Sequence, residues 1–134
     1  GNLILNGDFS QGNAHWSVRS GAGSVEFRDG YCFAKDGAVV EQKLELAPGN
    51  YRFSFESLFL VATTSFVNLS LEMSGLRKMF DLAAGPDYIP YTFAFSVPAP
   101  QDGANDLFLV QLIGDGAGGR FRNVQLVLVN AGTR

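Results

Sequence analysis

The feature that most constrains the fold of this chain is an alternation of apolar and polar residues with a period of two. In the segment YRFSFES, Tyr51, Phe53 and Phe55 alternate with polar residues. Successive side chains of a β-strand point to opposite faces, so this pattern predicts strands with one buried and one outward face. Only SGLRKMFDL approaches the spacing of an amphipathic helix. Because it lies between two predicted strands, we predict a strand there too.

The same alternation assigns faces to other strands. It places Met73 on the apolar side of FVNLSLEM with Val67, and it places Arg122 with Val124 on the side opposite Phe121. Turn pairs such as Asp-Gly and Asn-Gly favour tight reversals and separate the apolar runs. The predicted strands are residues 3–5, 16–19, 24–28, 31–35, 38–44, 51–61, 66–73, 77–82, 91–97, 107–113 and 121–129. Short strands at this spacing predict an all-β sandwich or barrel.

Length and composition limit the classes of protein that fit. The 134 residues predict one domain spanning residues 1–134, and 46% hydrophobic against 17% charged residues exclude a disordered chain. A formal net charge of -3 argues against a nucleic-acid partner, which a basic face would bind. The sequence lacks an apolar run of about 18 residues, so we expect no membrane-spanning helix.

The residues needed for catalysis do not assemble into a recognisable motif. His15 is the only histidine, and neither G-x-S-x-G nor H-E-x-x-H occurs. Cys32 is the only cysteine and lies in the apolar run YCFA, which predicts a buried thiol. The glycine-rich run GDGAGG predicts a hairpin loop. We therefore predict no catalytic residues and no enzyme, although glutamates in the strands leave an acid/base pair open.

Both ends of the chain resemble one family. The opening NLILNGDFSQGNAHW is similar to the start of carbohydrate-binding modules of the family 4, 9, 16 and 22 type, through Asn2, Leu3, Asn6, Gly7, Asp8, Phe9 and Trp16. YTFAFSVP and the final FRNVQL resemble the last third of such modules, and YRFSFES resembles a middle strand. The resemblance implies a galactose-binding-like jelly-roll β-sandwich of two antiparallel sheets. It also implies that the first and last strands pair and that Phe9 and Trp16 fill the core.

The resemblance also raises the question of a structural calcium ion. Many members hold calcium beside the end strands, and calcium takes six to eight oxygen ligands. The resemblance implies Asn123 and N-terminal backbone carbonyls as ligands here, and Asp8 and Asp36 are the acidic residues that would compensate for the departures of this chain from the family. Asn123 stands where the family has an aspartate, and Ser10 stands where it has a glutamate. The alternative is a calcium-free end held by hydrogen bonds.

The sugar-binding face implied by the resemblance is the concave sheet. Sugars bind to aromatic rings and to polar side chains that reach their hydroxyl groups. The candidate ligand-binding residues are Arg52, Glu56, Phe66, Asn68, Ser70, Glu72 and Gln111, with Tyr88 near a loop. The alternative for each is an ordinary solvated position on a sheet.

These observations lead to one functional expectation and two alternatives. We expect a non-catalytic module that binds a polysaccharide or oligosaccharide. The chain starts at a glycine, and we expect it to be a piece of a larger, extracellular multidomain protein, secreted or at the cell surface. The first alternative is a structural or protein-interaction sandwich, such as a spacer, virion or tail-fibre module. The second is a small carboxylate-dependent enzyme acting on polysaccharides.

Overall fold

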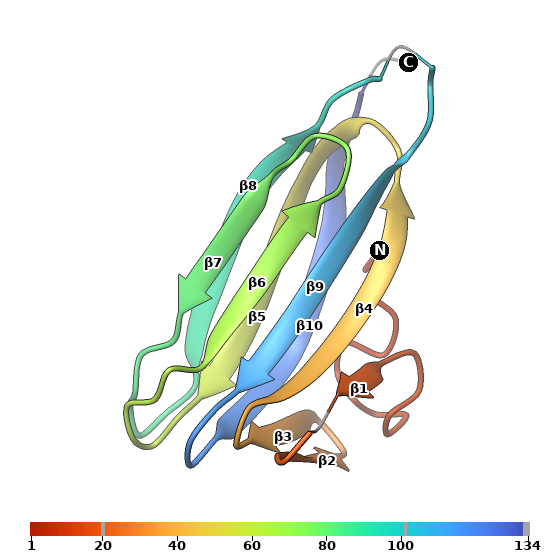
Figure 1. Ribbon diagram of the computed structural model, residues 1–134. Coiled ribbons are helices and arrows are strands. Elements are labelled where there is room, and N and C mark those ends of the chain that lie inside the picture. Colours follow the sequence, from red (N-terminus) through yellow and green to blue (C-terminus); the bar gives the residue numbers. More distant parts are fainter. Residues whose placement is uncertain (20, 101, 133–134) are drawn as a thin grey trace.

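Two five-stranded antiparallel sheets pack face to face in the computed structural model, which describes residues 1–19, 21–100 and 102–132 (Figure 1). Sheet A has the strand order β1-β4-β9-β6-β7, and sheet B has the order β2-β3-β10-β5-β8. The strands are β1 (Ser17–Arg19), β2 (Ser24–Arg28), β3 (Tyr31–Lys35), β4 (Ala38–Leu46), β5 (Gly49–Leu58), β6 (Phe66–Leu71), β7 (Arg77–Asp81), β8 (Ile89–Val97), β9 (Asp106–Gly114) and β10 (Gly119–Ala131).

The strand order confirms the predicted jelly-roll sandwich. From β3 onward, the chain places β3-β10-β5-β8 in one sheet and β4-β9-β6-β7 in the other, which is the order of two Greek keys wound into a double sheet. Most connections therefore cross between the sheets. The glycine-rich loop after β9 leads into β10 of the opposite sheet, so it is not the hairpin loop that the sequence indicated.

Phenylalanine is the most frequent residue in the core between the sheets. Phe108 of sheet A is fully buried and lies against two rings of sheet B, Phe95 at 5.6 Å and Phe53 at 6.2 Å between centroids. Cys32 is fully buried as predicted, and this burial raises the pKa of its thiol. The apolar alternation of the strands thus fills one continuous layer between the sheets.

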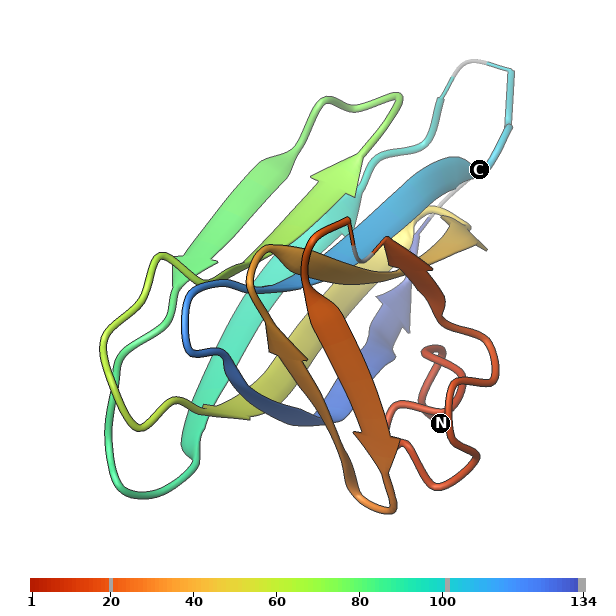
Figure 2. The same ribbon diagram turned by 60° about the horizontal axis from the view of Figure 1, so that its bottom comes forward.

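The first sixteen residues, here called the clasp, join one edge of sheet A to sheet B. Gln42 of β4 exchanges two hydrogen bonds with the backbone of Leu5, at 2.9 and 3.0 Å. The side chain of Asn2 bonds the backbone of β10 at Val124 and Leu126, and the N–H of Leu3 donates to the Leu126 carbonyl. Figure 2 shows this segment looping beside the last strand. The N-terminal end is therefore held in place, but by these hydrogen bonds and not by the pairing of first and last strands that the resemblance implied, because residues 1–16 contain no strand.

Asn6 organises the inside of the clasp. Its amide donates to the carbonyls of Gly12 and Ala14, and its side-chain oxygen accepts from the N–H of Gln11. Its own carbonyl accepts from the indole N–H of Trp16 at 2.9 Å. The rings of Trp16 and Phe9 are in contact, tilted by 30° with centroids 5.3 Å apart, and both are buried, which confirms their predicted place in the core.

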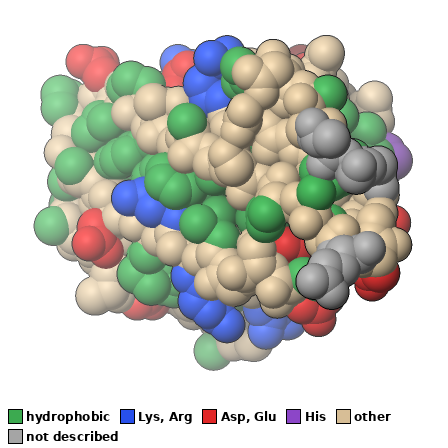
Figure 3. All heavy atoms as spheres, turned by 90° about the horizontal axis from the view of Figure 1, so that it is seen from above, with side chains coloured by type: hydrophobic (Ala, Val, Ile, Leu, Met, Phe, Trp, Pro, Cys, Tyr) green, Lys and Arg blue, Asp and Glu red, His purple; other side chains and the backbone are tan. Residues whose placement is uncertain are grey.

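The opposite end of the sandwich carries the turn between β6 and β7. The buried carboxylate of Asp106 accepts hydrogen bonds from the backbone N–H groups of Met73 and Ser74, at 2.8 and 3.1 Å. Figure 3 looks onto this end and shows hydrophobic side chains exposed among charged ones. Met73, in this turn, is 54% exposed because β6 ends at Leu71, so its predicted burial is wrong.

Three other local predictions need correction. Residues 3–5 form turns and a single backbone bond to β10 rather than a strand. Leu60 and Val61 lie in an exposed loop after β5, not in a strand. The alternation of β10 is interrupted by a bulge at Asn123, whose φ is 51°, so that Phe121 and Val124 are both buried. The segment 77–82 does form a strand, β7, as predicted.

Candidate functional site

The outward face of sheet A collects polar side chains from strands that are far apart in the sequence. Register places Glu41 of β4 opposite Gln111 of β9, and Gln111 opposite Asn68 of β6. Alternation along each strand directs these side chains away from the core, because their neighbours Val40, Leu112 and Val67 are fully buried. The three side chains therefore lie side by side on one face.

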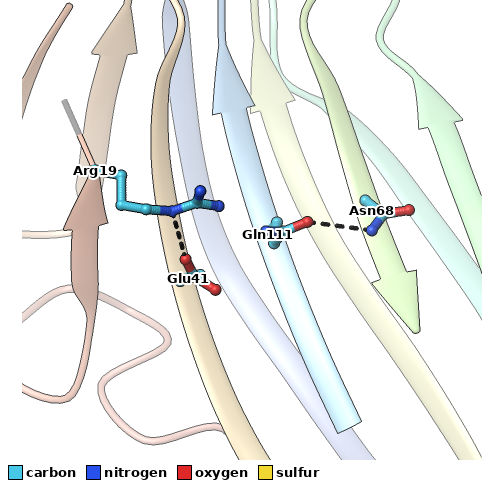
Figure 4. Close-up of polar contacts among 4 residues, drawn as sticks. All are labelled: Arg19, Glu41, Asn68 and Gln111. Atoms are coloured by element: carbon cyan, nitrogen blue, oxygen red, sulfur yellow. Dashed lines mark hydrogen bonds and ion pairs between the residues drawn. The ribbon is translucent and has the colours of Figure 1, made fainter. Parts of the chain in front are cut away.

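Arg19 of β1 completes this set, which we call the polar row: Arg19, Glu41, Gln111 and Asn68. The guanidinium of Arg19 reaches across β4 and donates to the Glu41 carboxylate at 2.9 Å (Figure 4). The amide of Asn68 donates to the Gln111 side-chain oxygen at 3.2 Å. Within the described chain, these bonds leave the Gln111 amide nitrogen as a donor and the Asn68 oxygen as an acceptor.

Apolar groups flank the polar row on the same face. Met79 of β7, which pairs with Asn68, is 56% exposed, and Phe66 and Leu109 are half-buried. Beyond Asn68, the face is hollowed by about 270 Å³ between Lys43, Ser70, Glu72, Arg77, Leu107 and Leu109. The face thus offers planar hydrogen-bonding groups next to apolar contact surface.

Most of the predicted ligand-binding residues gather on this face. They are Phe66, Asn68, Ser70 and Gln111, with Glu72 directly after β6. Prediction from sequence missed Arg19, Glu41, Lys43 and Arg77. Alternation in VVEQKLEL already places Glu41 and Lys43 on one side of a strand, but their nearness to Gln111 depends on the pairing of β4 with β9.

The remaining predicted ligand-binding residues lie on the opposite side of the molecule, on the outward face of sheet B. Arg52 and Glu56 belong to β5, and Tyr88 lies just before β8. The Glu56 carboxylate accepts from Arg122 at 2.7 Å and from Asn123 at 3.2 Å. The Arg122 guanidinium stands 3.6 Å from the centre of the Tyr88 ring. The carboxylate and one face of the ring are thus engaged by neighbouring side chains.

The Glu56 cluster predicts a pH-dependent contribution to stability. Burial pushes the pKa of Glu56 upward, but hydrogen bonds from Arg122 and Asn123 and the attraction of Arg122 outweigh it, and the pKa is lowered from 4.5. A lowered pKa stabilises the fold above the unfolded value and loses that effect as pH falls through the folded value. We expect Glu56→Gln to cost about 0.5 kcal/mol at pH 7, a value reduced by solvent screening of this partly exposed pair.

Urea unfolding of both proteins at several pH values tests this expectation. The difference in free energy of unfolding between the wild type and Glu56→Gln is expected to shrink from pH 7 toward pH 3. Glu26→Gln, at an exposed pair with Arg28, is the matched control. A difference that grows on acidification would contradict the assigned direction of the Glu56 pKa.

The three residues predicted to bind calcium are not brought together. Asp8 and Asn123 line one hollow beside the clasp, of about 480 Å³, but Asp36 lies in the turn between β3 and β4, where its N–H donates to the Gly116 carbonyl. Asp8 also accepts from the backbone N–H of Ser10 at 3.0 Å. Among residues 1–19, 21–100 and 102–132, no three acidic, histidine or cysteine side chains gather as metal ligands. Calcium binding stays a prediction.

Three carboxylates have pKa values below their ordinary range. Hydrogen bonds from the backbone and hydroxyl of Ser10 lower the pKa of Asp8, and those from the Thr64 hydroxyl and the Gly116 N–H lower the pKa of Asp115. The Glu56 pKa is lowered as well. A general acid for glycoside hydrolysis needs a raised pKa, so these three carboxylates are tuned in the opposite direction.

Comparison with solved structures places this fold among carbohydrate-binding modules. A family 16 carbohydrate-binding module superposes with a TM-score of 0.71 at 17% identity, covering 94% of this chain and 99% of the module. Modules of families 4, 22 and 61 have the same jelly-roll fold. No protein-family model and no curated protein matches the chain.

Two further structures with this fold are described by other activities. The enzymatically active domain of tailspike protein 4 from bacteriophage CBA120 gives a TM-score of 0.74 at 16% identity over 96% of this chain, which spans only 21% of that structure. A cyclase from Fischerella sp. TAU gives 0.71 at 15% identity, with 98% of each chain covered. At these identities the likeness concerns the fold alone.

In the described part of the chain, no helix is long and apolar enough to cross a membrane.

Proposed function

We propose that this chain is a non-catalytic carbohydrate-binding module whose ligand, a polysaccharide or oligosaccharide, lies on the outward face of sheet A. The observation that carries the proposal is the polar row, in which Arg19, Glu41, Gln111 and Asn68 follow one another across four strands. The mutual hydrogen bonds hold these planar side chains in one orientation before a ligand arrives, which reduces the entropy cost of binding.

The chemistry of the row suits a sugar. Each hydroxyl group of a sugar both donates and accepts a hydrogen bond, and the row offers amide donors and acceptors beside a carboxylate and a guanidinium. The apolar side chains of Met79, Leu109 and Phe66 give the C–H faces of a sugar ring a contact surface. The open, strand-spanning shape favours a stretch of a glycan chain over a small enclosed ligand.

The wider role belongs to the same proposal. Residues 1–134 act as one module of a larger, extracellular protein, and glycan binding holds the rest of that protein near its substrate by raising the effective concentration. The lowered pKa values of Asp8, Glu56 and Asp115 argue against these three carboxylates as general acids. If calcium binds in the hollow beside the clasp, the side chains of Asp8 and Asn123 are the ligands that this hollow offers.

Gln111→Ala is expected to weaken glycan binding about tenfold, since it removes one hydrogen-bond donor and leaves Asn68 without its partner. The measurement is binding to immobilised neutral and acidic polysaccharides, with and without calcium, followed by calorimetry on the best ligand. Gln125→Ala makes the same chemical change at an exposed position of β10 in sheet B and is expected to leave binding on sheet A unchanged.

The outcomes separate this proposal from its rival. Saturable binding that Gln111→Ala weakens and Gln125→Ala does not would support the sheet A site. Equal effects of both variants would overturn it. Absence of binding to every polysaccharide would favour a structural or protein-contact module. A loss of binding on chelation would place a calcium ion in the fold.

A further inference from the structure

A third hollow, of about 580 Å³, lies on the opposite side of the molecule from the polar row. It opens on the outward face of sheet B over β2, β3 and β10. Strands β2 and β3 form a hairpin, which comes forward in Figure 2. Its volume is typical of a site for a small ligand, and its lining is mostly apolar with a few charged groups. The lining includes Glu26, Tyr31, Phe33, Leu58, Leu60 and Arg120.

Register aligns four of these residues in a second row. Glu26 pairs with Phe33, Phe33 pairs with Arg120, and Arg120 pairs with Leu58. The backbone of Phe33 therefore lies between those of Glu26 and Arg120, which are two strand spacings, about 10 Å, apart. The half-buried ring of Phe33 thus has a carboxylate-bearing strand on one side and an arginine-bearing strand on the other.

The charges in this hollow are not equally compensated. Glu26 pairs with Arg28 at 3.4 Å, so its negative charge is partly neutralised. Arg120 makes no ion pair in the described part of the chain, and its guanidinium lies 4.3 Å from the centre of the Tyr31 ring. Stacking on Tyr31 holds the guanidinium flat and leaves its N–H groups available at the edge. A carboxylate is the group that such an edge binds through two parallel hydrogen bonds.

We propose that this hollow is a second ligand site, which binds one acidic sugar residue, a pyranose carrying a carboxylate. Its ring stacks on Phe33, its carboxylate pairs with Arg120, and its hydroxyl groups reach Glu26. The exposed side chains of Leu60 (74%) and Val61 (54%) form an apolar wall beside the ring. This site is separate from the sheet A face in residues and ligand, so either can fail without the other.

Affinity electrophoresis of the whole chain in gels containing polygalacturonate or neutral galactan tests the proposal. The net charge of -3 opposes general attraction to a polyanion, so retardation by polygalacturonate requires a local site. We expect retardation by polygalacturonate that weakens as salt rises, and a loss of about tenfold in affinity for Arg120→Gln. Phe33→Leu, which keeps an apolar side chain, is expected to lose a similar factor through the missing ring.

Matched controls keep each outcome decisive. Arg52→Gln removes another exposed arginine from the outward face of sheet B and is expected to change nothing. Gln125→Ala, at an exposed position of β10 outside this hollow, is expected to leave retardation by polygalacturonate intact. Equal losses for Arg52→Gln and Arg120→Gln, or no retardation of the wild type, would overturn the proposal. So would a dimer that Leu60→Arg dissociates in light scattering, because the hollow would then hold a second copy.

Discussion

Replacing Phe108 with alanine is expected to lower the free energy of unfolding by about 3–5 kcal/mol. Phe108 is fully buried in β9, and its ring meets Phe95 and Phe53 of the opposite sheet. Its removal leaves a cavity between the layers, which the surrounding strands cannot close because each is held by neighbours in its own sheet. The loss is a large fraction of the 5–15 kcal/mol that stabilises a typical domain.

Urea unfolding followed by circular dichroism measures this loss. Phe33→Ala is the matched control, because the same atoms are removed from a half-buried ring on the outward face of sheet B. We expect it to cost less than half as much. A cost for Phe108→Ala below about 1 kcal/mol would mean that the sheets close over the cavity, against the packing described above.

Replacing Asn6 with alanine is expected to cost about 2–4 kcal/mol, the second largest effect. The substitution removes hydrogen bonds to Gly12, Ala14 and Gln11. It also forces alanine into a left-handed conformation, since Asn6 has a φ of 52°. The clasp then loosens, and Trp16 loses the fixed carbonyl that accepts its indole N–H.

Two variants separate the causes of this effect. Asn6→Gly adopts the left-handed conformation without strain and is expected to recover about 1 kcal/mol of the loss. Asn13→Ala changes an exposed asparagine in the same loop and is expected to be nearly neutral. Trp16 is the only tryptophan, so its fluorescence during urea unfolding follows the clasp directly. A neutral Asn6→Ala would show that the clasp does not depend on this side chain.

The sequence predicted the sandwich because alternation is a local signal. The buried phenylalanines of YRFSFES are two residues apart, so they indicate which face of the strand is buried, and the turn residues indicate where each strand ends. The bulge at Asn123 has no such signal, because an inserted residue shifts the alternation without altering the composition. The apolar start of the chain looked like a strand, but the side chains of Asn2, Asn6 and Gln42 hold it as a looped clasp.

The candidate site was harder to predict, because a jelly roll alternates its strands between sheets. Consecutive strands β5 and β6 lie in opposite sheets, so the outward residues Arg52 and Glu56 face away from Asn68 and Ser70. Arg19 joins Glu41 only through the pairing of β1 with β4. Pairing between distant segments decides which polar residues lie side by side. Local patterns in a single sequence do not show which strands pair, so these neighbours could not be predicted.

The burial of Cys32 gives the molecule an internal reporter of its own opening. The thiol is enclosed and its pKa is raised, so a thiol-reactive label can reach it only when β3 separates from its neighbours. With no other cysteine in the chain, every labelled molecule records one such event. The labelling rate in native buffer therefore measures the free energy of local opening. Because Cys32 lies between Tyr31 and Phe33, an acidic sugar bound above them should slow that labelling.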